Sequence, residues 1–232
     1  MTWALLFDLD DTLIDECDYQ KSAANAIAHY LEATGFPIEL VCQAIRCADP
    51  PGSPRRYQQI LRQIAMPGIN VTVDDLIRVH REHSPMLSFR PDVLPMLQML
   101  QGIDVRLGIV TDGAAITQRK KLNAVNADYY FDSLVVTDEL GPNRSYWKPH
   151  PRPFRLACRQ LNVPLSRAIY VGDNPEKDFH ISSVLPVTTV RLLRQDGIHC
   201  RKRYLEGVTE HHSVTALTEI PELVKSIGAR VK

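Results

Sequence analysis

The chain has 232 residues, of which 44% are hydrophobic and 23% are charged, a composition typical of a globular protein with a substantial core. Its 27 Lys and Arg residues balance its 27 Asp and Glu residues, and this zero formal charge argues against nucleic acid or a membrane surface as a partner, since both favour a basic excess. The five cysteines are scattered without a C-x-x-C pair, which argues against a disulfide framework or a zinc ribbon. The chain shows no signal-peptide pattern and no 18-residue apolar run, so we expect a cytoplasmic protein.

The first predicted element is a buried strand in the apolar run at residues 3–9. Residues 15–88 then contain no convincing strand, and their amphipathic patterns predict helices over residues 21–34, 38–48, 57–66 and 72–84. Thr72 is the expected N-cap of the last helix, and a loop rich in Pro and Gly at residues 49–56 separates the second helix from the third. We therefore predict an all-helical cap domain at residues 15–88, inserted into a core domain formed by residues 1–14 and 89–232.

Strand and helix patterns alternate through the rest of the chain. Apolar runs predict strands at residues 105–111, 133–137, 168–172, 187–193 and 213–217. Helix patterns occupy residues 92–101, 116–126, 152–162, 176–185 and 220–227. Repeated strand–helix units with apolar strands indicate an α/β fold, a doubly wound, Rossmann-like parallel sheet covered by helices on both faces.

Acidic residues directly follow several of the predicted strands, at residues 8–12, 111–113, 137–139 and 172–178, and Lys148 lies in the loop after residues 133–137. In open parallel sheets, ligands bind beyond the carboxyl ends of the strands, so we expect these side chains to converge on one rim. Clustered carboxylates are tolerated where a divalent cation neutralises them, and a hard oxygen ligand set favours Mg²⁺. A carboxylate can also attack phosphorus and form an aspartyl-phosphate, provided that cationic and N–H groups stabilise the charge on the transferring group.

Four segments resemble the four motifs of the haloacid dehalogenase-like (HAD) phosphohydrolases: "FDLDDTL" at 7–13, "IVTDG" at 109–113, the lysine of "WKPHP" at 147–151, and "YVGDNPEKD" at 170–178. They occur in that family's order and on the same predicted elements, and the helical block lies where the family inserts its first-position cap. The resemblance covers nearly the whole chain. It implies a Mg²⁺-dependent phosphatase that acts on a small phosphorylated metabolite.

The resemblance implies roles for the residues of the first two motifs. Asp8 would be the nucleophile and a metal ligand. Asp10 would be the general acid for the leaving alcohol and then the base for the water that hydrolyses the aspartyl-phosphate, and its backbone carbonyl would also bind the metal. Thr111 would bind the phosphoryl oxygens together with backbone groups of Asp112 and Gly113. Because dehalogenases of this superfamily lack the acid at the position of Asp10, its presence favours phosphoryl chemistry.

The other two motifs supply a cation and further metal ligands. By the same resemblance, Lys148 would pair with both Asp8 and the phosphate. Asp173 would bind Mg²⁺ directly, and Asp178 would hold it either directly or through water. The resemblance gives Asp11 no assigned role, and a purely structural role for Asp11 stays open.

Several polar residues outside this pattern have two interpretations. Asp112 stands where the family more often carries Asn, which brings an additional acid toward the phosphate unless the side chain points away. Arg55 and Arg56, in the loop of the cap, either bind an anionic substrate or are ordinary exposed residues. Four residues near the C-terminus follow no standard zinc spacing, and we interpret them as surface or packing residues: His199, Cys200, His211 and His212.

The family resemblance leaves the reaction open among related classes. A sugar phosphomutase would share Asp8, Asp10 and the cap but would return the phosphoryl group to a sugar instead of to water. A phosphonate-cleaving relative would need a cap lysine as a Schiff base, and Lys21 is the only lysine in the predicted cap. A non-catalytic binding protein that retains the HAD fold is the alternative from another class. The preferred substrate, by analogy with the family, is a sugar phosphate or a phosphorylated acid.

Overall fold

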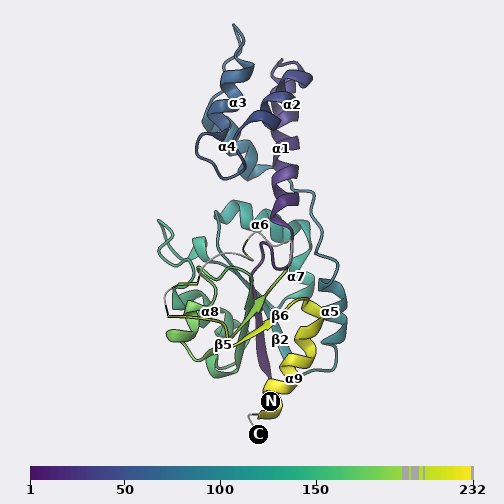
Figure 1. Ribbon diagram of the computed structural model, residues 1–232, viewed down its shortest axis with the longest axis vertical. Helices are drawn as coiled ribbons and strands as arrows, with labels where there is room; N and C mark the ends of the chain where they lie inside the picture. The colour runs from purple at the N-terminus through teal and green to yellow at the C-terminus, as the bar shows by residue number, and fades with distance from the viewer. Residues whose placement is uncertain (195–198, 200–203, 206, 231–232) are drawn as a thin grey trace. The chain divides into compact units, whose positions relative to one another are not determined.

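The computed structural model describes residues 1–194, 199, 204–205 and 207–230 of the chain. Cys200 and the basic residues 201–203 therefore lie outside the described residues. The chain divides into two compact units, which we call the α/β unit (Met1–Asp15 and Ser88–Lys232) and the helical unit (Glu16–Leu87) (Figure 1). Among the described residues, no helix combines the length and the apolar character needed to cross a membrane.

The α/β unit contains a six-stranded sheet whose strands all run parallel, in the order β3-β2-β1-β4-β5-β6. The strands are β1 (Trp3–Phe7), β2 (Val105–Thr111), β3 (Ser133–Val136), β4 (Ala168–Gly172), β5 (Val187–Leu192) and β6 (His212–Val214). Strand β1 pairs with β2 on one side and with β4 on the other, and all of its residues are buried. A strand covered on both faces needs apolar side chains in both directions, which is why "WALLF" is a continuous hydrophobic run.

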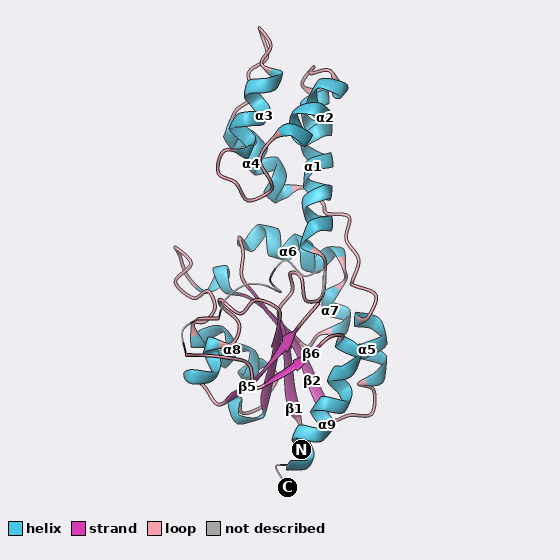
Figure 2. Ribbon diagram, viewed as in Figure 1, coloured by secondary structure: helices cyan, strands magenta, loops and turns pink. Residues whose placement is uncertain are grey.

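Helices cover both faces of this sheet: α8 lies on one face, and α5 and α9 lie on the other (Figure 2). The helices of the unit are α5 (Val93–Met99), α6 (Ala115–Ala124), α7 (Ala127–Tyr130), α8 (Pro151–Gln160) and α9 (Ile220–Arg230). On the α8 side, Phe154 and Ala157 pack into a core with Leu6, Val110 and Tyr170 from the strands. The predicted fold class, a doubly wound, Rossmann-like α/β sheet, is confirmed.

The strand order brings three chain segments together at the carboxyl end of the sheet. The chain adds β2 and β3 on one side of β1 and β4 to β6 on the other, so the order reverses at β1. The register places Phe7, the last residue of β1, beside Ile109 of β2 and Val171 of β4. The segments that leave these strands therefore emerge next to one another, at the point where open α/β sheets bind their ligands.

The helical unit consists of α1 (Glu16–Ala33), α2 (Ile38–Cys47), α3 (Arg56–Ile64) and α4 (Val73–Glu82). The apolar faces of these helices form a core of their own, which includes Leu31, Ile60 and Leu76. The predicted N-cap is confirmed, since the Thr72 hydroxyl accepts the backbone N–H of Asp75 at 3.1 Å. The Asp75 carboxylate accepts the backbone N–H of Thr72 in return, at 3.0 Å, which completes a capping box.

Two segments differ from the sequence prediction. The α-helix predicted at residues 176–185 is wrong, because the structure has only a short 3-10 helix there, His180–Ser183. Just before it, the Asn174 side chain accepts the Glu176 N–H at 3.0 Å, and the Asp178 carboxylate accepts the Asn174 N–H at 2.9 Å. These local bonds compete with those of a helix. The short helix α7 was not indicated by the sequence pattern.

Candidate functional site

Asp8 lies directly beyond β1 and is enclosed by protein. Its backbone N–H donates to the Val171 carbonyl at 2.9 Å, and its side chain is only 1% exposed. Oδ1 lies 2.8 Å from Lys148 Nζ, and Oδ2 lies 3.3 Å from Lys177 Nζ. Burial alone would raise the pKa of Asp8, but the two lysines outweigh it and lower the pKa to about 2. Asp8 is therefore a buried carboxylate that is ionised at neutral pH.

Lys148 is a buried cation between two acids. Its Nζ lies 2.8 Å from Asp8 Oδ1 and 2.9 Å from Asp178 Oδ1, and it donates to the Tyr170 hydroxyl at 2.6 Å. Tyr170 in turn donates to Asp178 Oδ1 at 3.1 Å. Burial lowers the pKa of Lys148, but Asp178 and Asp8 outweigh this effect and raise it above its ordinary value. The ammonium group thus stays charged although it is shielded from water.

Asp112 follows β2 and positions the loop that carries Lys148. Its Oδ1 accepts the backbone N–H of Lys148 at 3.0 Å and the hydroxyl of Thr137 at 2.7 Å. Its Oδ2 lies 4.0 Å from Lys177 Nζ. Burial is the main cause that raises the pKa of this carboxyl above its ordinary value. An acid at this position therefore has a structural use, because it ties the end of β2 to the loop of the lysine.

Asp10 and Thr111 share one neighbour, Gln118 of helix α6. The Gln118 amide donates to Asp10 Oδ2 at 3.0 Å and to the Thr111 hydroxyl at 2.6 Å. Lys121, one turn further along α6, places its Nζ 2.8 Å from Asp10 Oδ1. Gly113 leaves room for this arrangement, since a Cβ atom there would lie 2.8 Å from the Gln118 side chain. The general-acid candidate is therefore oriented by α6, and not by the lysines that surround the nucleophile candidate.

Three buried carboxylates lie close enough to share a cation. Oxygen atoms of Asp8, Asp173 and Asp178 lie within 4.8 Å of one another. Gly172 makes this possible, since a Cβ there would lie 2.5 Å from Asp178 Oδ2. Asp173 Oδ2 is buried and accepts no hydrogen bond from the described residues, and burial, with Asp178 and Asp8, raises the pKa of Asp173 to about 8. This oxygen-only donor set fits a hard divalent cation, which would relieve the repulsion among the acids.

Sequence reasoning missed four side chains of the site: Gln118, Lys121, Tyr170 and Lys177. Lys177 lies inside the motif at residues 170–178, so its position in the sequence was an available signal. Gln118 and Lys121 had only their helical spacing to mark them. Tyr170 was included in an apolar strand, where a tyrosine is more often part of the core.

The polar residues singled out in the helical unit make local contacts. Arg56 donates to the backbone carbonyl of Asp49, and Arg55 is exposed at the start of α3. Lys21 forms an ion pair with Asp18 on helix α1 at 2.8 Å. A role of either arginine in substrate binding, and of Lys21 as a Schiff base, stays a prediction.

Known proteins resemble this chain in sequence and in fold. The haloacid dehalogenase-like hydrolase family matches residues 5–192, and the chain therefore belongs to this family. A glyceraldehyde 3-phosphate phosphatase of Methanopyrus kandleri is 32% identical over 203 residues, which cover 84% of this chain and 85% of the relative. Human N-acylneuraminate-9-phosphatase is 24% identical, over 98% of this chain and 96% of its own. A putative HAD hydrolase of Bacillus subtilis, solved bound to magnesium, has a similar fold, with a TM-score of 0.66 at 18% identity over 96% of this chain and 98% of that one.

These similarities confirm the predicted family and the predicted class of enzyme. The protein is a HAD-type phosphoric monoester hydrolase. The structure brings the predicted residues Asp8, Lys148, Asp173 and Asp178 into one buried cluster, with Asp10 and Thr111 in a network of their own. The chemical roles of the individual residues stay predictions.

Proposed function

We propose that the protein is a Mg²⁺-dependent phosphatase that hydrolyses a small phosphomonoester through an aspartyl-phosphate on Asp8. The observation that carries this proposal is the buried, ionised Asp8 carboxylate between Lys148 and Lys177, at 2.8 and 3.3 Å. A carboxylate attacks phosphorus only in its ionised form, and the phosphoryl group that it receives needs positive charge nearby. Both conditions are met at this residue.

In the proposed reaction, an Asp8 oxygen bonds to phosphorus and the bond from phosphorus to the ester oxygen breaks. Asp10 gives its proton to that oxygen, so the alcohol leaves neutral. Asp10 then takes a proton from a water molecule, whose oxygen attacks phosphorus, releases phosphate and restores the Asp8 carboxylate. The contacts of Asp10 with Gln118 at 3.0 Å and Lys121 at 2.8 Å would hold its carboxyl in position for both transfers.

The other residues of the site would bind the phosphoryl group and the cation. We assign the phosphoryl oxygens to the Thr111 hydroxyl, the backbone of Asp112 and Gly113, and Lys148. We assign Mg²⁺ to the carboxylates of Asp8, Asp173 and Asp178, the last either directly or through water, and to the Asp10 carbonyl. When bound, Mg²⁺ neutralises these acids and part of the charge on the transferring group.

The substrate we propose is a sugar phosphate or a phosphorylated acid of similar size. This proposal is supported by the relatives, whose names refer to glyceraldehyde 3-phosphate and N-acylneuraminate 9-phosphate chemistry. We further propose that the helical unit acts as a cap that excludes water and bulky substrates from the site. Arg55 and Arg56 are the candidates for contacts with an anionic substrate, and Arg56 lines a cavity of about 300 Å³ within that unit.

The test is phosphate release from a panel of glyceraldehyde 3-phosphate, sugar phosphates, phosphorylated acids and p-nitrophenyl phosphate, with and without Mg²⁺. We expect Mg²⁺-dependent release that Asp8→Asn reduces to below about a thousandth of the wild-type rate, because an amide is not a nucleophile here. Asp128→Asn makes the same chemical change at an exposed position of α7 and serves as the matched control. Full activity in Asp8→Asn would rule out the proposed mechanism.

The same panel separates the alternatives. An isomerised sugar phosphate formed without net phosphate release would identify a phosphomutase. Borohydride trapping of a substrate on Lys21 would identify phosphonate cleavage. Failure to form a stable beryllofluoride complex in the presence of Mg²⁺ would favour the alternative of a non-catalytic binding protein.

A further inference from the structure

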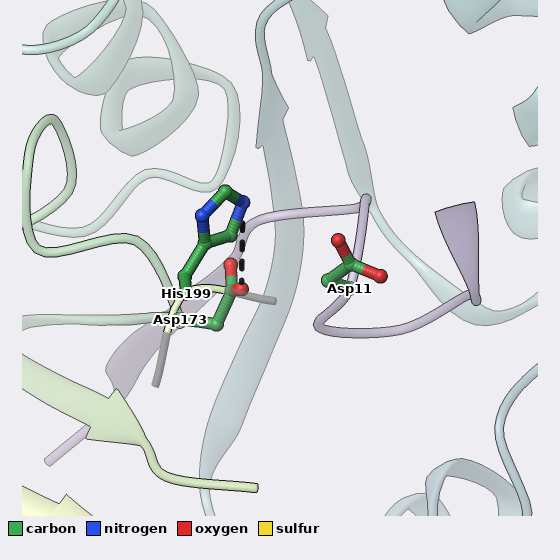
Figure 3. Close-up of side chains that lie close together, drawn as sticks. All are labelled: Asp11, Asp173 and His199. Carbon is green, nitrogen blue, oxygen red and sulfur yellow. Dashed lines mark ion pairs between the residues drawn. The ribbon is translucent and has the colours of Figure 1, made fainter. Parts of the chain in front are cut away.

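A second group of potential ligands lies beside the proposed Mg²⁺ site. Asp11, Asp173 and His199 each offer one ligand atom, and these three atoms lie within 4.8 Å of one another. The residues come from three distant parts of the chain: Asp11 from the turn after β1, Asp173 from the loop after β4, and His199 from the segment after β5 (Figure 3). No spacing rule for zinc motifs covers such a set, which is why sequence analysis interpreted His199 as a surface or packing residue.

The backbone of His199 is held by a buried arginine. Arg191, the next-to-last residue of β5, is 4% exposed, and its Nη2 donates to the His199 carbonyl at 3.1 Å. Its Nη1 donates to the Tyr204 hydroxyl, and its guanidinium lies 4.9 Å from the centre of the Tyr204 ring. The arginine therefore ties the backbone of His199 to the end of β5, the strand that follows the loop of Asp173 in the chain.

The separation between His199 and Asp173 is too long for a hydrogen bond and short enough for both side chains to bind one cation. His199 Nε2 lies 4.0 Å from Asp173 Oδ2, beyond the range of about 2.7–3.2 Å for a hydrogen bond. Ligand atoms about 2.1 Å from a six-coordinate ion lie about 3 Å apart when adjacent and about 4.2 Å apart when opposite. Asp173 is 7% exposed, and its Oδ2 accepts no hydrogen bond from the described residues. This oxygen therefore points into the space between the three side chains without a donor to satisfy it.

We propose that Asp11, Asp173 and His199 form a site for a divalent transition-metal cation, next to the oxygen-only set of Asp8, Asp173 and Asp178. Imidazole nitrogen favours transition metals such as Co²⁺, Ni²⁺ or Zn²⁺ over Mg²⁺, which takes oxygen ligands and retains its waters. The Asp173 carboxylate belongs to both sets, so the two cations compete for it or share it. His199 then gives this chain a preference among metals that the four family motifs do not specify. The geometry alone carries this inference, which does not depend on the phosphatase activity.

The test uses the full chain, freed of metal and titrated with Co²⁺ in excess Mg²⁺, without substrate. We expect Co²⁺ to bind despite the Mg²⁺, and the proton NMR spectrum of the Co²⁺-loaded protein to show hyperfine-shifted resonances of one imidazole ring. His199→Ala should remove these resonances and weaken Co²⁺ binding at least tenfold, roughly the loss that follows when a ligand's support is removed. Asp11→Asn is a second variant, which should weaken Co²⁺ binding while the imidazole resonances remain.

Two controls make the result specific. His29→Ala removes an exposed histidine of α1 and should leave the Co²⁺ spectrum unchanged. Asp8→Asn removes the proposed nucleophile and one oxygen ligand of the neighbouring set, and its Co²⁺ spectrum should still show the imidazole ring. Retention of the ring resonances in His199→Ala, or complete displacement of Co²⁺ by Mg²⁺ in the wild type, would overturn the proposal. Since no measurement here uses turnover, its failure is distinct from failure of the proposed phosphatase function.

Discussion

The α/β unit and the helical unit differ in what they bury. Within the described residues, every buried charged or amide side chain lies in the α/β unit, among them Asp8, Lys148 and Asp178. The buried side chains of the helical unit are apolar apart from Tyr19, whose hydroxyl donates to the His80 carbonyl at 2.9 Å. The α/β unit thus has an interior that contains charged side chains, and the helical unit has an almost entirely apolar interior.

This difference separates chemistry from packing. An ionised group taken out of water costs several kcal/mol unless partners compensate it, so a fold that buries acids and lysines together does so for a use other than stability. The apolar core of the helical unit carries no such cost, and any contribution of this unit to binding must come from side chains outside that core. Substitutions in the two units should therefore change the free energy of unfolding by different amounts, and these changes should depend differently on pH.

The largest expected effect follows from Lys148→Met in the charged interior. The change leaves Asp8 and Asp178 buried beside each other without their shared cation, so we expect a loss of about 3–5 kcal/mol in the free energy of unfolding. Phosphate release should fall at least about a hundredfold. Urea unfolding and the phosphatase assay measure the two effects. Lys225→Met, at an exposed ion pair of α9, is the matched control. Equal stability of the two variants would contradict the expectation that the loss of a buried cation costs more than the loss of an exposed one.

A smaller effect should depend on pH and on metal. In the metal-free protein, the pKa of Asp173 is about 8 in the folded state, against an ordinary value of 3.8. Between these values the folded state keeps a proton that the unfolded state has released, so stability falls as the pH rises through this window. Asp173→Asn removes this effect and should be more stable than the wild type by about 2–4 kcal/mol near pH 8 and by much less near pH 4. The measurement is urea unfolding in the presence of a chelator across this pH range. If the stabilities of the wild type and of Asp173→Asn changed with pH in parallel, the charge of Asp173 would not be the cause.

The smallest effect is expected in the helical unit. Thr72→Ala removes the hydroxyl that accepts the Asp75 N–H at 3.1 Å, at an exposed helix start, and should cost about 1 kcal/mol. Because no buried charge is involved, the cost should not vary between pH 6 and pH 8. Hydrogen exchange of the α4 amides reports the change locally, and Thr72→Ser, which keeps the hydroxyl, is the control. If the stability difference between Thr72→Ala and the wild type depended strongly on pH, the helical unit would respond to pH as the charged interior does, which would contradict the comparison of the two units.

The same contrast explains what the sequence could predict. The strands at residues 105–111 and 168–172 were predicted with the bounds that the structure has. The strand at 168–172 is buried throughout and reads as a continuous apolar run, whereas the strand at 105–111 is buried only over its second half. The motif residues could be placed at the strand ends because acids that directly follow buried parallel strands lie at the rim where such sheets bind ligands. Gln118 and Lys121 could not be found in this way, since their contact with Asp10 depends on which face of α6 meets the turn after β1. The same holds for His199, whose neighbours lie far from it in the sequence.

The contacts of Lys148 use all three N–H donors of its ammonium group. An ammonium group carries three N–H bonds, and Asp8, Asp178 and the Tyr170 hydroxyl each receive one of them. The lysine can therefore donate to a phosphoryl oxygen only by giving up one of these acceptors. In the proposed mechanism, Asp8 is the partner whose charge is consumed when it bonds to phosphorus, so the N–H now directed at Asp8 is the one that a phosphoryl oxygen would receive. Lys148 would then change its acceptor at each half of the reaction, while its contacts with Tyr170 and Asp178 keep its direction constant.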